Sequence, residues 1–233
     1  MFMIEKTHGF PSILVIVAAL NEEKGVGPTL ADIKTCLDKP FCLVVDGRST
    51  DCTTKIAESM GAVVVTQKGS GKGDAIATAI AHSQLIDARY VVFIDADYTY
   101  PAEHLLKMVR ILEENPQTGM VCGNRFAGSL DFESMHNMFY VGNRLLAFAH
   151  NLLNGVHLED PLTGLRLVRW DIMKDWKPRS KGFDVEAELN HYVERKGYGI
   201  VEVPIRYRKR LGEKKLKLRH GITIFKRILS ETV

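Results

Sequence analysis

The sequence has few of the features that mark several common protein classes. Four cysteines occur among 233 residues, without CxxC spacing or the density of a secreted scaffold, so neither a zinc site nor a disulfide framework is indicated. We expect free thiols in a reducing compartment. The longest apolar run, Ile13–Leu20, is far shorter than the roughly 20 residues of a spanning helix, and no basic n-region precedes it. We therefore expect neither a spanning helix nor export.

Charge of one sign is not in large excess either. The net charge of +3 and the pI of about 8.6 are too small to indicate a nucleic-acid-binding protein, although Lys and Arg concentrate near the C-terminus. The sequence also lacks the GxGxxG of dinucleotide-binding enzymes after its first apolar run. Its 45% hydrophobic and 25% charged residues are typical of a single globular domain, residues 1–233.

Apolar runs alternate with amphipathic stretches in the first half, which predicts an α/β fold with a mostly parallel sheet flanked by helices. Strands are expected at 12–19, 41–46, 62–67 and 90–95, each followed by a helix. In the less regular second half we expect strands near 120–123 and at 199–204, and helices at about 135–153 and 184–196. Ligands bind at the carboxyl ends of such strands. The segments that fall there are Leu20–Glu23, Asp46, Lys72 and Asp95–Asp97.

Two carboxylates end the fourth expected strand. In "VVFIDADYTYP", residues 91–101, Asp95 and Asp97 repel each other unless a cation lies between them or one of them is protonated. A hard divalent ion such as Mg²⁺ or Mn²⁺ resolves this conflict and is usually shared with the phosphates of a substrate. An isolated Asp-x-Asp is also compatible with a solvated acidic turn, so the neighbouring segments decide.

A glycine-rich loop follows the third expected strand. "GSGKGD" differs from the P-loop, because Gly73 stands where Ser or Thr is needed and Thr66 stands where the first glycine belongs. A nucleotide hydrolase is therefore not indicated. Lys72 is placed to meet a diphosphate as a point charge, and the alternative is an exposed loop lysine.

Together these segments resemble a known family. "NEE", "VVDGRSTDCT", "GKGDA" and "DADYTYP" are similar to the donor half of a family 2, GT-A type glycosyltransferase. The later "GNRF", "DPLTGLR", "FDVEAEL" and "EVPIRYRKRLGEKKL" resemble its polyprenyl-phosphate branch, which includes dolichyl-phosphate mannose and glucose synthases. The resemblance covers nearly the whole chain in the right order. It implies a GT-A, Rossmann-like fold, with residues of about 10–125 binding a nucleotide sugar and about 126–233 forming a mixed acceptor side.

The resemblance also implies roles for single residues. Asp95 and Asp97 match the DxD signature, whose metal bridges the two phosphates of the donor and acts as a Lewis acid on the departing diphosphate. Asn21 lies in the matching "NEE" segment, Glu22 and Asp46 match positions that contact the nucleobase, and Lys72 lies on a segment lining the nucleotide. These residues are the expected donor site.

Some positions depart from the family pattern. Ala18, Gly47 and Cys52 replace a usual proline, a frequent Asp and a common glycine, and Thr99 stands where the mannose branch has a metal-binding Gln. The third protein ligand of the metal is therefore open, and water is an alternative. "VDGxSTD" and "DADxTYP" are more similar to the glucose or N-acetylglucosamine side than to the mannose side, which favours a UDP-sugar over GDP-mannose.

The identity of the acceptor decides whether the protein must supply a base. A sugar hydroxyl needs a carboxylate to take its proton, whereas a phosphate monoester is already anionic at neutral pH and needs cations instead. Four residues match basic positions of the lipid-phosphate branch, and arginine's fork suits phosphate oxygens. They are Arg125, Arg166, Arg210 and Lys215, with Lys214 replacing a usual serine. For the C-terminal run a solvated face is the alternative.

Acidic residues of the second half are further candidates. Asp160, in "EDPLTG", occupies the place where hydroxyl-directed relatives keep a base, and we expect an active-site role in positioning rather than in proton abstraction. It is alternatively a partner of Arg166 or of its own loop. Glu186 and Glu188 are two apart on a helix and cannot share a face, so at most one of them looks into the cleft. Asp184 and Glu186 are the better candidates for a position in the cleft.

A prenyl chain is too long to bury in a small domain, so such an enzyme is expected to work as a peripheral protein on the cytoplasmic face of a membrane. The tail has Leu218, Ile222, Phe225 and Leu229 at helical spacing with basic residues among them, which fits an interfacial helix. Packing of this stripe on the protein's own core is the alternative.

Three hypotheses therefore remain. The first is metal-dependent, inverting transfer of a sugar from a nucleotide sugar to dolichyl or another polyprenyl phosphate. The second is the same fold acting on a soluble acceptor, a sugar hydroxyl or phosphoglycerate, which the basic tail disfavours. The third is a non-catalytic nucleotide-sugar-binding protein, which the retention of Asp95, Asp97, Lys72 and Arg166 disfavours.

Overall fold

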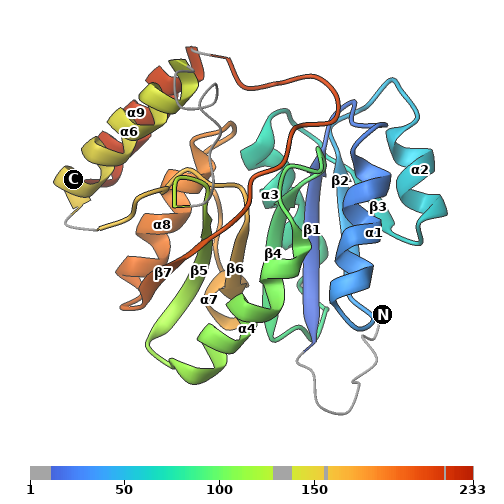
Figure 1. Ribbon diagram of the computed structural model, residues 1–233, viewed down its shortest axis with the longest axis horizontal. Coiled ribbons are helices and arrows are strands. Elements are labelled where there is room, and N and C mark those ends of the chain that lie inside the picture. The colour runs from blue at the N-terminus through green and yellow to red at the C-terminus, as the bar shows by residue number, and fades with distance from the viewer. Residues whose placement is uncertain (1–11, 128–137, 155–156, 218, 233) are drawn as a thin grey trace.

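The computed structural model describes residues 12–127, 138–154, 157–217 and 219–232, and within them seven strands form one sheet in the order β3-β2-β1-β4-β6-β5-β7 (Figure 1). All strands run parallel except β6, which is antiparallel to β4 and to β5. The predicted mostly parallel sheet with a mixed C-terminal region is thus confirmed. The strands are β1 Ile13–Ala19, β2 Phe41–Asp46, β3 Val63–Thr66, β4 Tyr90–Asp95, β5 Thr118–Asn124, β6 Arg166–Arg169 and β7 Gly199–Pro204.

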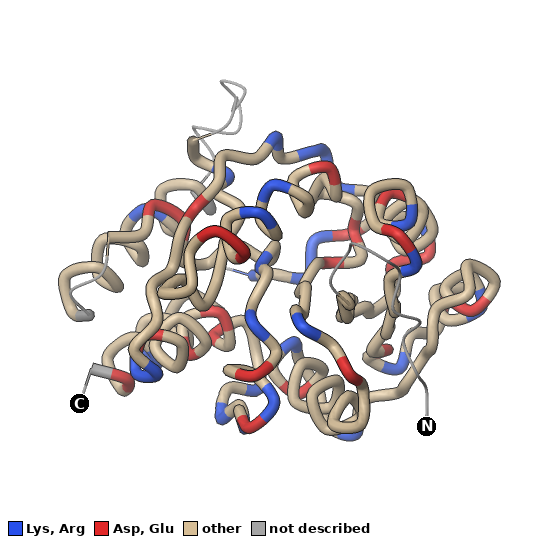
Figure 2. Tube along the Cα trace, turned by 90° about the horizontal axis from the view of Figure 1, so that it is seen from below, with Lys and Arg blue, Asp and Glu red and all other residues tan. Residues whose placement is uncertain are grey.

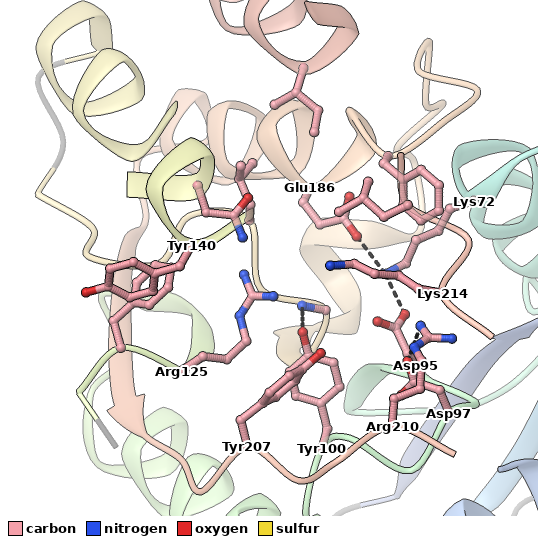
Figure 3. A pocket seen from close by; sticks show the side chains of 17 residues that line it. Lys72, Asp95, Asp97, Tyr100, Arg125, Tyr140, Glu186, Tyr207, Arg210 and Lys214 are labelled. Carbon is pink, nitrogen blue, oxygen red and sulfur yellow. Dashed lines mark hydrogen bonds and ion pairs between the residues drawn. The ribbon is translucent and has the colours of Figure 1, made fainter. Parts of the chain in front are cut away.

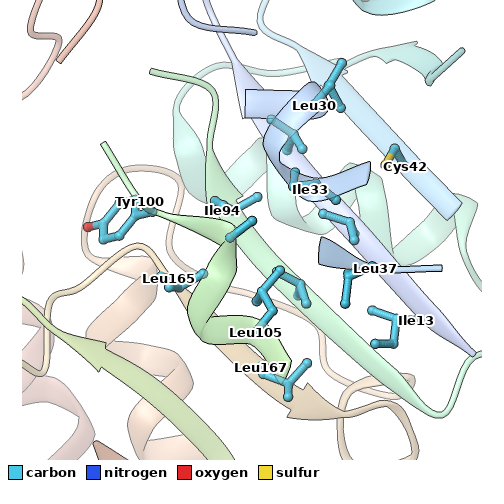
Figure 4. Packing of buried hydrophobic residues seen from close by; sticks show 14 of the residues in the cluster. Ile13, Leu30, Ile33, Leu37, Cys42, Ile94, Tyr100, Leu105, Leu165 and Leu167 are labelled. Atoms are coloured by element: carbon cyan, nitrogen blue, oxygen red, sulfur yellow. The ribbon is translucent and has the colours of Figure 1, made fainter. Parts of the chain in front are cut away.

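Helices cover both faces of the sheet. Alternate residues of β1 enter opposite cores, since Val15 packs with the helices of one face and Ile16 with those of the other. One face carries α1 Val26–Cys36, α2 Thr53–Ser59 and, after the short 3₁₀ helix Ala102–His104, α4 Leu105–Glu114 (Figure 4). The other face carries α3 Lys72–His82, α7 Trp170–Met173 and α8 Val185–Arg195. A sheet buried on both faces explains why its strands are nearly continuous apolar runs.

Two helices lie outside these layers, α6 Met138–Asn154 and α9 Arg219–Thr232. They pack against each other, and α9 also packs against α8 (Figure 1). Ile224 and Ile228 of α9 are buried against Ala187 of α8, while other apolar residues of α9 are exposed. One face of α9 therefore packs on the protein itself, which was the alternative for the tail, while another apolar face of the helix stays exposed. Of the predicted helix at 135–153, residues 135–137 lie outside the described residues, as does Leu218 of the predicted stripe.

Two further observations bear on the expectations above. All four cysteines are unpaired. Within the described ranges, every helix falls short of the length and apolar character that crossing a bilayer requires.

Candidate active site

The carboxylate pair lies at the carboxyl end of β4, near the middle of the sheet. Asp95 ends the strand and pairs in register with Ala18 of β1. Oδ1 of the buried Asp97 accepts hydrogen bonds from the backbone N–H of Thr99 (3.0 Å) and from its hydroxyl (2.5 Å). Thr99 is itself buried. It therefore holds Asp97 in place and does not face the cleft as a third metal ligand.

Lys72, the first residue of α3, is ion-paired with two carboxylates. Its Nζ lies 2.5 Å from Oδ1 of Asp95 and 2.7 Å from Oε1 of Glu186 (Figure 3). Burial by itself lowers the pKa of Lys72, but the two carboxylates raise it overall, so the ammonium stays charged. The helix start packs closely on the loop before α8, since a Cβ on Gly73 would lie 2.1 Å from the carbonyl oxygen of Ser180. This contact accounts for a glycine where a P-loop has Ser or Thr.

Arg210 provides the second cation. Its guanidinium is ion-paired with Asp97 and, at 2.9 Å, with Oε1 of Glu22, which Lys215 approaches to 3.8 Å. Burial raises the pKa of Glu22 to about 7, and burial followed by the charge of Asp95 raises the pKa of Asp97. The repulsion inferred from the sequence is therefore present, and basic side chains offset it.

Arg210 belongs to residues 205–217, which we call the C-terminal strap. In Figure 1 this segment leaves β7 and crosses the carboxyl ends of the central strands before α9. Beside the carboxylate pair it is held by the backbone N–H of Arg208, which donates to the carbonyl of Thr99 (2.9 Å), and by that of Leu211, which donates to the carbonyl of Asp97 (3.0 Å). Basic and acidic positions are interspersed along the described part of the trace (Figure 2), and the strap is one place where they pair.

Two pockets meet at these charges. The first, the sheet-end pocket, lies over the ends of β1, β2 and β3 and includes Glu22, Gly47 and Gln67. The second, the helix-side pocket, lies between the sheet and α6 and α9 (Figure 3). Both pockets are lined by Lys72, Asp95, Asp97, Phe183 and Arg210. A molecule in one pocket therefore meets a molecule in the other beside the carboxylate pair.

The helix-side pocket brings together four basic side chains, Lys72, Arg125, Arg210 and Lys214, beside the acidic Asp95, Asp97 and Glu186. Arg125 lines it and makes a two-pronged ion pair with the buried Asp160, with Nε to Oδ2 and NH2 to Oδ1 both at 2.7 Å. Lys214 lines the same pocket, and after burial the charges of Arg210 and Arg125 lower its pKa. Aromatic side chains, among them Tyr140 and Tyr207, complete the wall (Figure 3). Such a lining suits an anion attached to an apolar group.

The position of Asp160 supports the expectation of a positioning role. Both of its carboxylate oxygens contact Arg125, and its Oδ2 also accepts the backbone N–H of that residue at 3.0 Å. Its partner is Arg125 and not Arg166, which was the alternative in the sequence.

Two predicted phosphate-binding residues lie elsewhere. Arg166 is 1% exposed, and its donors are used by the carbonyls of Thr163 and Pro161 and by the side chain of Asn190, so it does not reach the pocket. The prediction of Arg166 as a catalytic, acceptor-contacting residue is wrong for this reason. Lys215 approaches Glu22 and lines the sheet-end pocket, apart from Arg125 and Lys214, and its contact with an acceptor phosphate stays a prediction.

The expected nucleobase contacts are only partly exposed to the sheet-end pocket. Glu22 lines it, whereas the carboxylate of Asp46 accepts the backbone N–H groups of Arg48 (2.9 Å) and Ser49 (3.1 Å) of its own loop. Asn21 accepts the N–H of Thr50 at 2.8 Å and thereby joins two loops of the rim. Asn21 and Asp46 thus shape the rim, and their contact with the donor stays a prediction.

The acidic residues at the start of α8 point in different directions, as the two-residue spacing of Glu186 and Glu188 indicated. Glu186 points to Lys72, whereas Asp184 pairs with Arg227 of α9 at 3.2 Å, and Glu188 accepts the N–H groups of Arg179 and Ser180. Of the two preferred candidates, Glu186 lines the helix-side pocket as expected, whereas Asp184 lines neither pocket and the expectation for it is wrong, because Arg227 engages its carboxylate. Tyr140 and Tyr207 join the pocket without having been assigned to it from the sequence.

The carboxylate pair suits a hard divalent cation. Oε2 of Glu22 is buried without a hydrogen-bond partner, Oδ2 of Asp97 is buried against the guanidinium of Arg210, and the side chain of Asp95 is 27% exposed. Among the described residues no group of three His, Cys, Asp or Glu side chains is arranged around a common centre. Mg²⁺ and Mn²⁺ are commonly held by one or two carboxylates, with substrate phosphates and water as the other ligands. Asp95 and Asp97 fit that pattern.

Comparisons with known proteins agree with this geometry. A family model described as "Glycosyl transferase family 2" matches residues 14–176. A dolichyl-phosphate hexose transferase of Haloferax volcanii is 35% identical over 212 residues, which are 90% of this chain and 88% of that protein. Glycosyltransferase AglJ of the same organism is 33% identical over 84% of this chain, which spans 63% of AglJ.

A solved structure shows the same fold. Glucosyl-3-phosphoglycerate synthase from Mycobacterium tuberculosis, crystallised with Mn²⁺, UDP and glucosyl-3-phosphoglycerate, superposes with a TM-score of 0.76. The match covers 99% of this chain and 87% of that protein at 21% sequence identity. The predicted fold is therefore confirmed.

Proposed function

Because the chain belongs to glycosyl transferase family 2, and is therefore a glycosyltransferase, we propose that it transfers a sugar from a nucleotide sugar to dolichyl or another polyprenyl phosphate. The observation that carries the proposal is the meeting of two pockets at one charged wall. Residues of about 10–125 supply most of the donor side and about 126–233 most of the acceptor side. Arg210 and Lys215 cross from the second part to the first.

On the donor side, the nucleotide lies in the sheet-end pocket and its diphosphate reaches the shared wall. A divalent ion held by Asp95 and Asp97 would neutralise charge on the leaving diphosphate. Lys72 and Arg210, which pair with these carboxylates, are placed to contact the same phosphates. We propose a UDP-sugar of glucose or N-acetylglucosamine as donor, with GDP-mannose second. The motif "VDGxSTD" and the UDP bound to the mycobacterial enzyme support this choice.

On the acceptor side, Arg125, Arg210 and Lys214 receive the lipid phosphate in the helix-side pocket. A phosphate oxygen attacks the anomeric carbon from the side opposite the leaving group, and the bond from that carbon to the donor diphosphate breaks. The bonding electrons leave with the nucleoside diphosphate, so the configuration inverts. The acceptor is already anionic, so no side chain has to remove a proton. This agrees with the engagement of both oxygens of Asp160 by Arg125.

A soluble acceptor is the second candidate. The mycobacterial enzyme of the same fold is named for phosphoglycerate, which is also a phosphate monoester. The basic and aromatic lining of the helix-side pocket accommodates either phosphate, but the apolar surface of the neighbouring helices favours the lipid.

Transfer to lipid is tested with purified protein, Mn²⁺ or Mg²⁺, a panel of labelled UDP- and GDP-sugars and a short polyprenyl phosphate. We expect label in the organic phase with one donor, and 3-phosphoglycerate in place of the lipid is the matched comparison. Label that stays in water with every donor contradicts the lipid acceptor, and label incorporated into phosphoglycerate supports the second candidate.

The exposed surface of α6 and α9 supports the proposal that the enzyme acts at a membrane surface. Of the ten exposed large hydrophobic side chains in the described residues, seven lie on these two helices. They form what we call the apolar face: Val141, Leu145, Phe148, Leu152, Ile222, Phe225 and Leu229. The exposed basic residues Arg144, Arg219 and Lys226 lie on the same helices, which suits an anionic lipid surface. Tyr140 of α6 and Ile224 of α9 line the helix-side pocket, so the face adjoins the proposed acceptor site.

We therefore propose a peripheral protein at the cytoplasmic face of a membrane, where its unpaired cysteines stay reduced. Exchanging Leu145 and Phe148 for Glu is expected to lower binding to vesicles with about 30% anionic lipid at least tenfold, since each exchange replaces apolar burial by a charge. Cosedimentation measures this. Leu85→Glu, at a still more exposed position away from both helices, is the control. Unchanged vesicle binding, or a dimer that dissociates in the double variant, contradicts the proposal.

A further inference from the structure

A buried polar cluster lies behind the helix-side pocket. Its centre is Arg166 of β6, one of the largest fully buried side chains described. Nε donates to the carbonyl of Thr163 (2.9 Å), and NH2 donates to the carbonyl of Pro161 (2.6 Å). NH1 donates to Oδ1 of Asn190 at 2.5 Å. The guanidinium is thus surrounded by neutral acceptors that are held in fixed places.

Asn190 of α8, which is fully buried, joins three parts of the chain. Besides accepting from Arg166, it donates from Nδ2 to the carbonyl of Pro161 at 2.9 Å. The same nitrogen lies 3.2 Å from Nε2 of His150 on α6. Because arginine has only donors, the amide oxygen of Asn190 must face Arg166 and its nitrogen must face Pro161.

His150 matches this arrangement. Burial, followed by the nearby His191, lowers the pKa of His150 to about 4, so the ring is neutral at neutral pH and adds no second positive charge beside Arg166.

The loop held by these bonds, residues 160–164, touches both sides of the reaction site. At one end Asp160 grips Arg125 with both oxygens. At the other end the N–H of Gly164 donates to the hydroxyl of Tyr100 at 2.7 Å, and a Cβ on Gly164 would lie 2.5 Å from Oδ2 of Asp95. A shift of the loop therefore moves Arg125 relative to the shared wall of the pockets.

We propose that Asn190, together with Arg166, is a positioning residue for the acceptor. The two side chains hold the carbonyls of Pro161 and Thr163, which keeps Asp160 in place to aim Arg125 into the helix-side pocket. Their effect falls on acceptor binding and not on donor binding. The claim that acceptor binding is affected rests on the proposed function, whereas the claim that Asn190 and Arg166 hold Arg125 in place does not.

The informative exchange is Asn190→Asp. Aspartate keeps an acceptor for Arg166, but its second oxygen cannot donate to the carbonyl of Pro161 and repels it. The control is Leu189→Ala, which removes buried packing from the adjacent residue of α8 without touching the loop, so it reports general loss of stability. Thermal unfolding curves of both variants are recorded to establish that each is folded at the assay temperature.

Two readouts decide. In nitrogen-15 NMR spectra the Nε–H of Arg125, held by Asp160, is expected to exchange slowly with water in the wild type and in Leu189→Ala, and fast in Asn190→Asp. The KM for polyprenyl phosphate is expected to rise about 10- to 100-fold in Asn190→Asp with the donor KM unchanged. Slow exchange in Asn190→Asp, or equal changes in Leu189→Ala, overturns the positioning role. A third result separates the two proposals. If the Nε–H of Arg125 exchanges fast in Asn190→Asp but the wild type transfers no sugar to lipid, the positioning role is retained and the proposed function is overturned.

Discussion

Replacing Asp97 by Asn is expected to lower kcat/KM for sugar transfer by about 10²- to 10³-fold or more. Asparagine has nearly the same shape, and its oxygen can still accept the two hydrogen bonds from Thr99. What is lost is one negative charge at the wall shared by both pockets, and with it the ion pair to Arg210 and the attraction for a divalent cation. The loss of activity therefore reports the charge of Asp97 and not its packing. Steady-state kinetics with Mn²⁺ and the active donor measure it.

The matched control for this exchange is Asp171→Asn, which removes a carboxylate from the exposed start of α7. It should retain wild-type kinetics. A chelator is expected to abolish transfer by the wild type, and added Mn²⁺ or Mg²⁺ to restore it. Full activity in the chelator, or wild-type turnover by Asp97→Asn, would remove the metal and the carboxylate pair from the mechanism.

Exchange of Arg125 for Lys should raise the KM for polyprenyl phosphate about 100-fold with little change in the donor KM. Lysine retains the positive charge but loses the planar fork that meets Asp160 with two bonds and presents the remaining donors to the pocket. A smaller effect is expected if the acceptor is held by charge alone. Initial rates over a range of acceptor concentrations, at saturating donor, separate KM from kcat.

A second arginine serves as the control for Arg125. Arg169 of β6 uses its guanidinium on the carbonyls of Thr118, Leu112 and Asn115, away from either pocket. Arg169→Lys therefore loses a comparable set of hydrogen bonds, and any change in acceptor KM that it shares with Arg125→Lys reflects stability. If the donor KM rises as much as the acceptor KM in Arg125→Lys, the assignment of the helix-side pocket to the acceptor is contradicted.

Much of the donor-side geometry could be predicted from the chain alone because parallel strands bring their carboxyl ends to one edge. Asp95 and Asp97 end a buried run, and Lys72 starts the helix after β3, whose carboxyl end lies at the same edge of the sheet although β2 and β1 separate β3 from β4. Helix α3 packs on β1 and β2, and its first residue Lys72 reaches Asp95. The assignment of Thr99 stayed open because a hydroxyl beside a carboxylate bonds either to that carboxylate or to a ligand. Burial decided for the former.

The residues of the acceptor side were harder to predict from the sequence, because a motif does not show whether an arginine faces a pocket or is buried. Arg125 and Arg166 both matched basic positions, yet one lines a pocket and the other is buried with its donors satisfied by carbonyls. Lys214 and Lys215 are adjacent in the strap and line different pockets, because successive side chains of an extended segment point to opposite sides.

What the sequence alone determined is the sheet with its helices and the gathering of Asp95, Asp97 and Lys72 at its edge, since hydrophobic periodicity and strand ends are local properties. Only the tertiary structure decided that Arg125, and not Arg166, faces the helix-side pocket, and that Arg210 of the strap pairs with Glu22 and Asp97. These contacts join residues far apart in the chain. Which of several equivalent charges becomes buried depends on the packing around it.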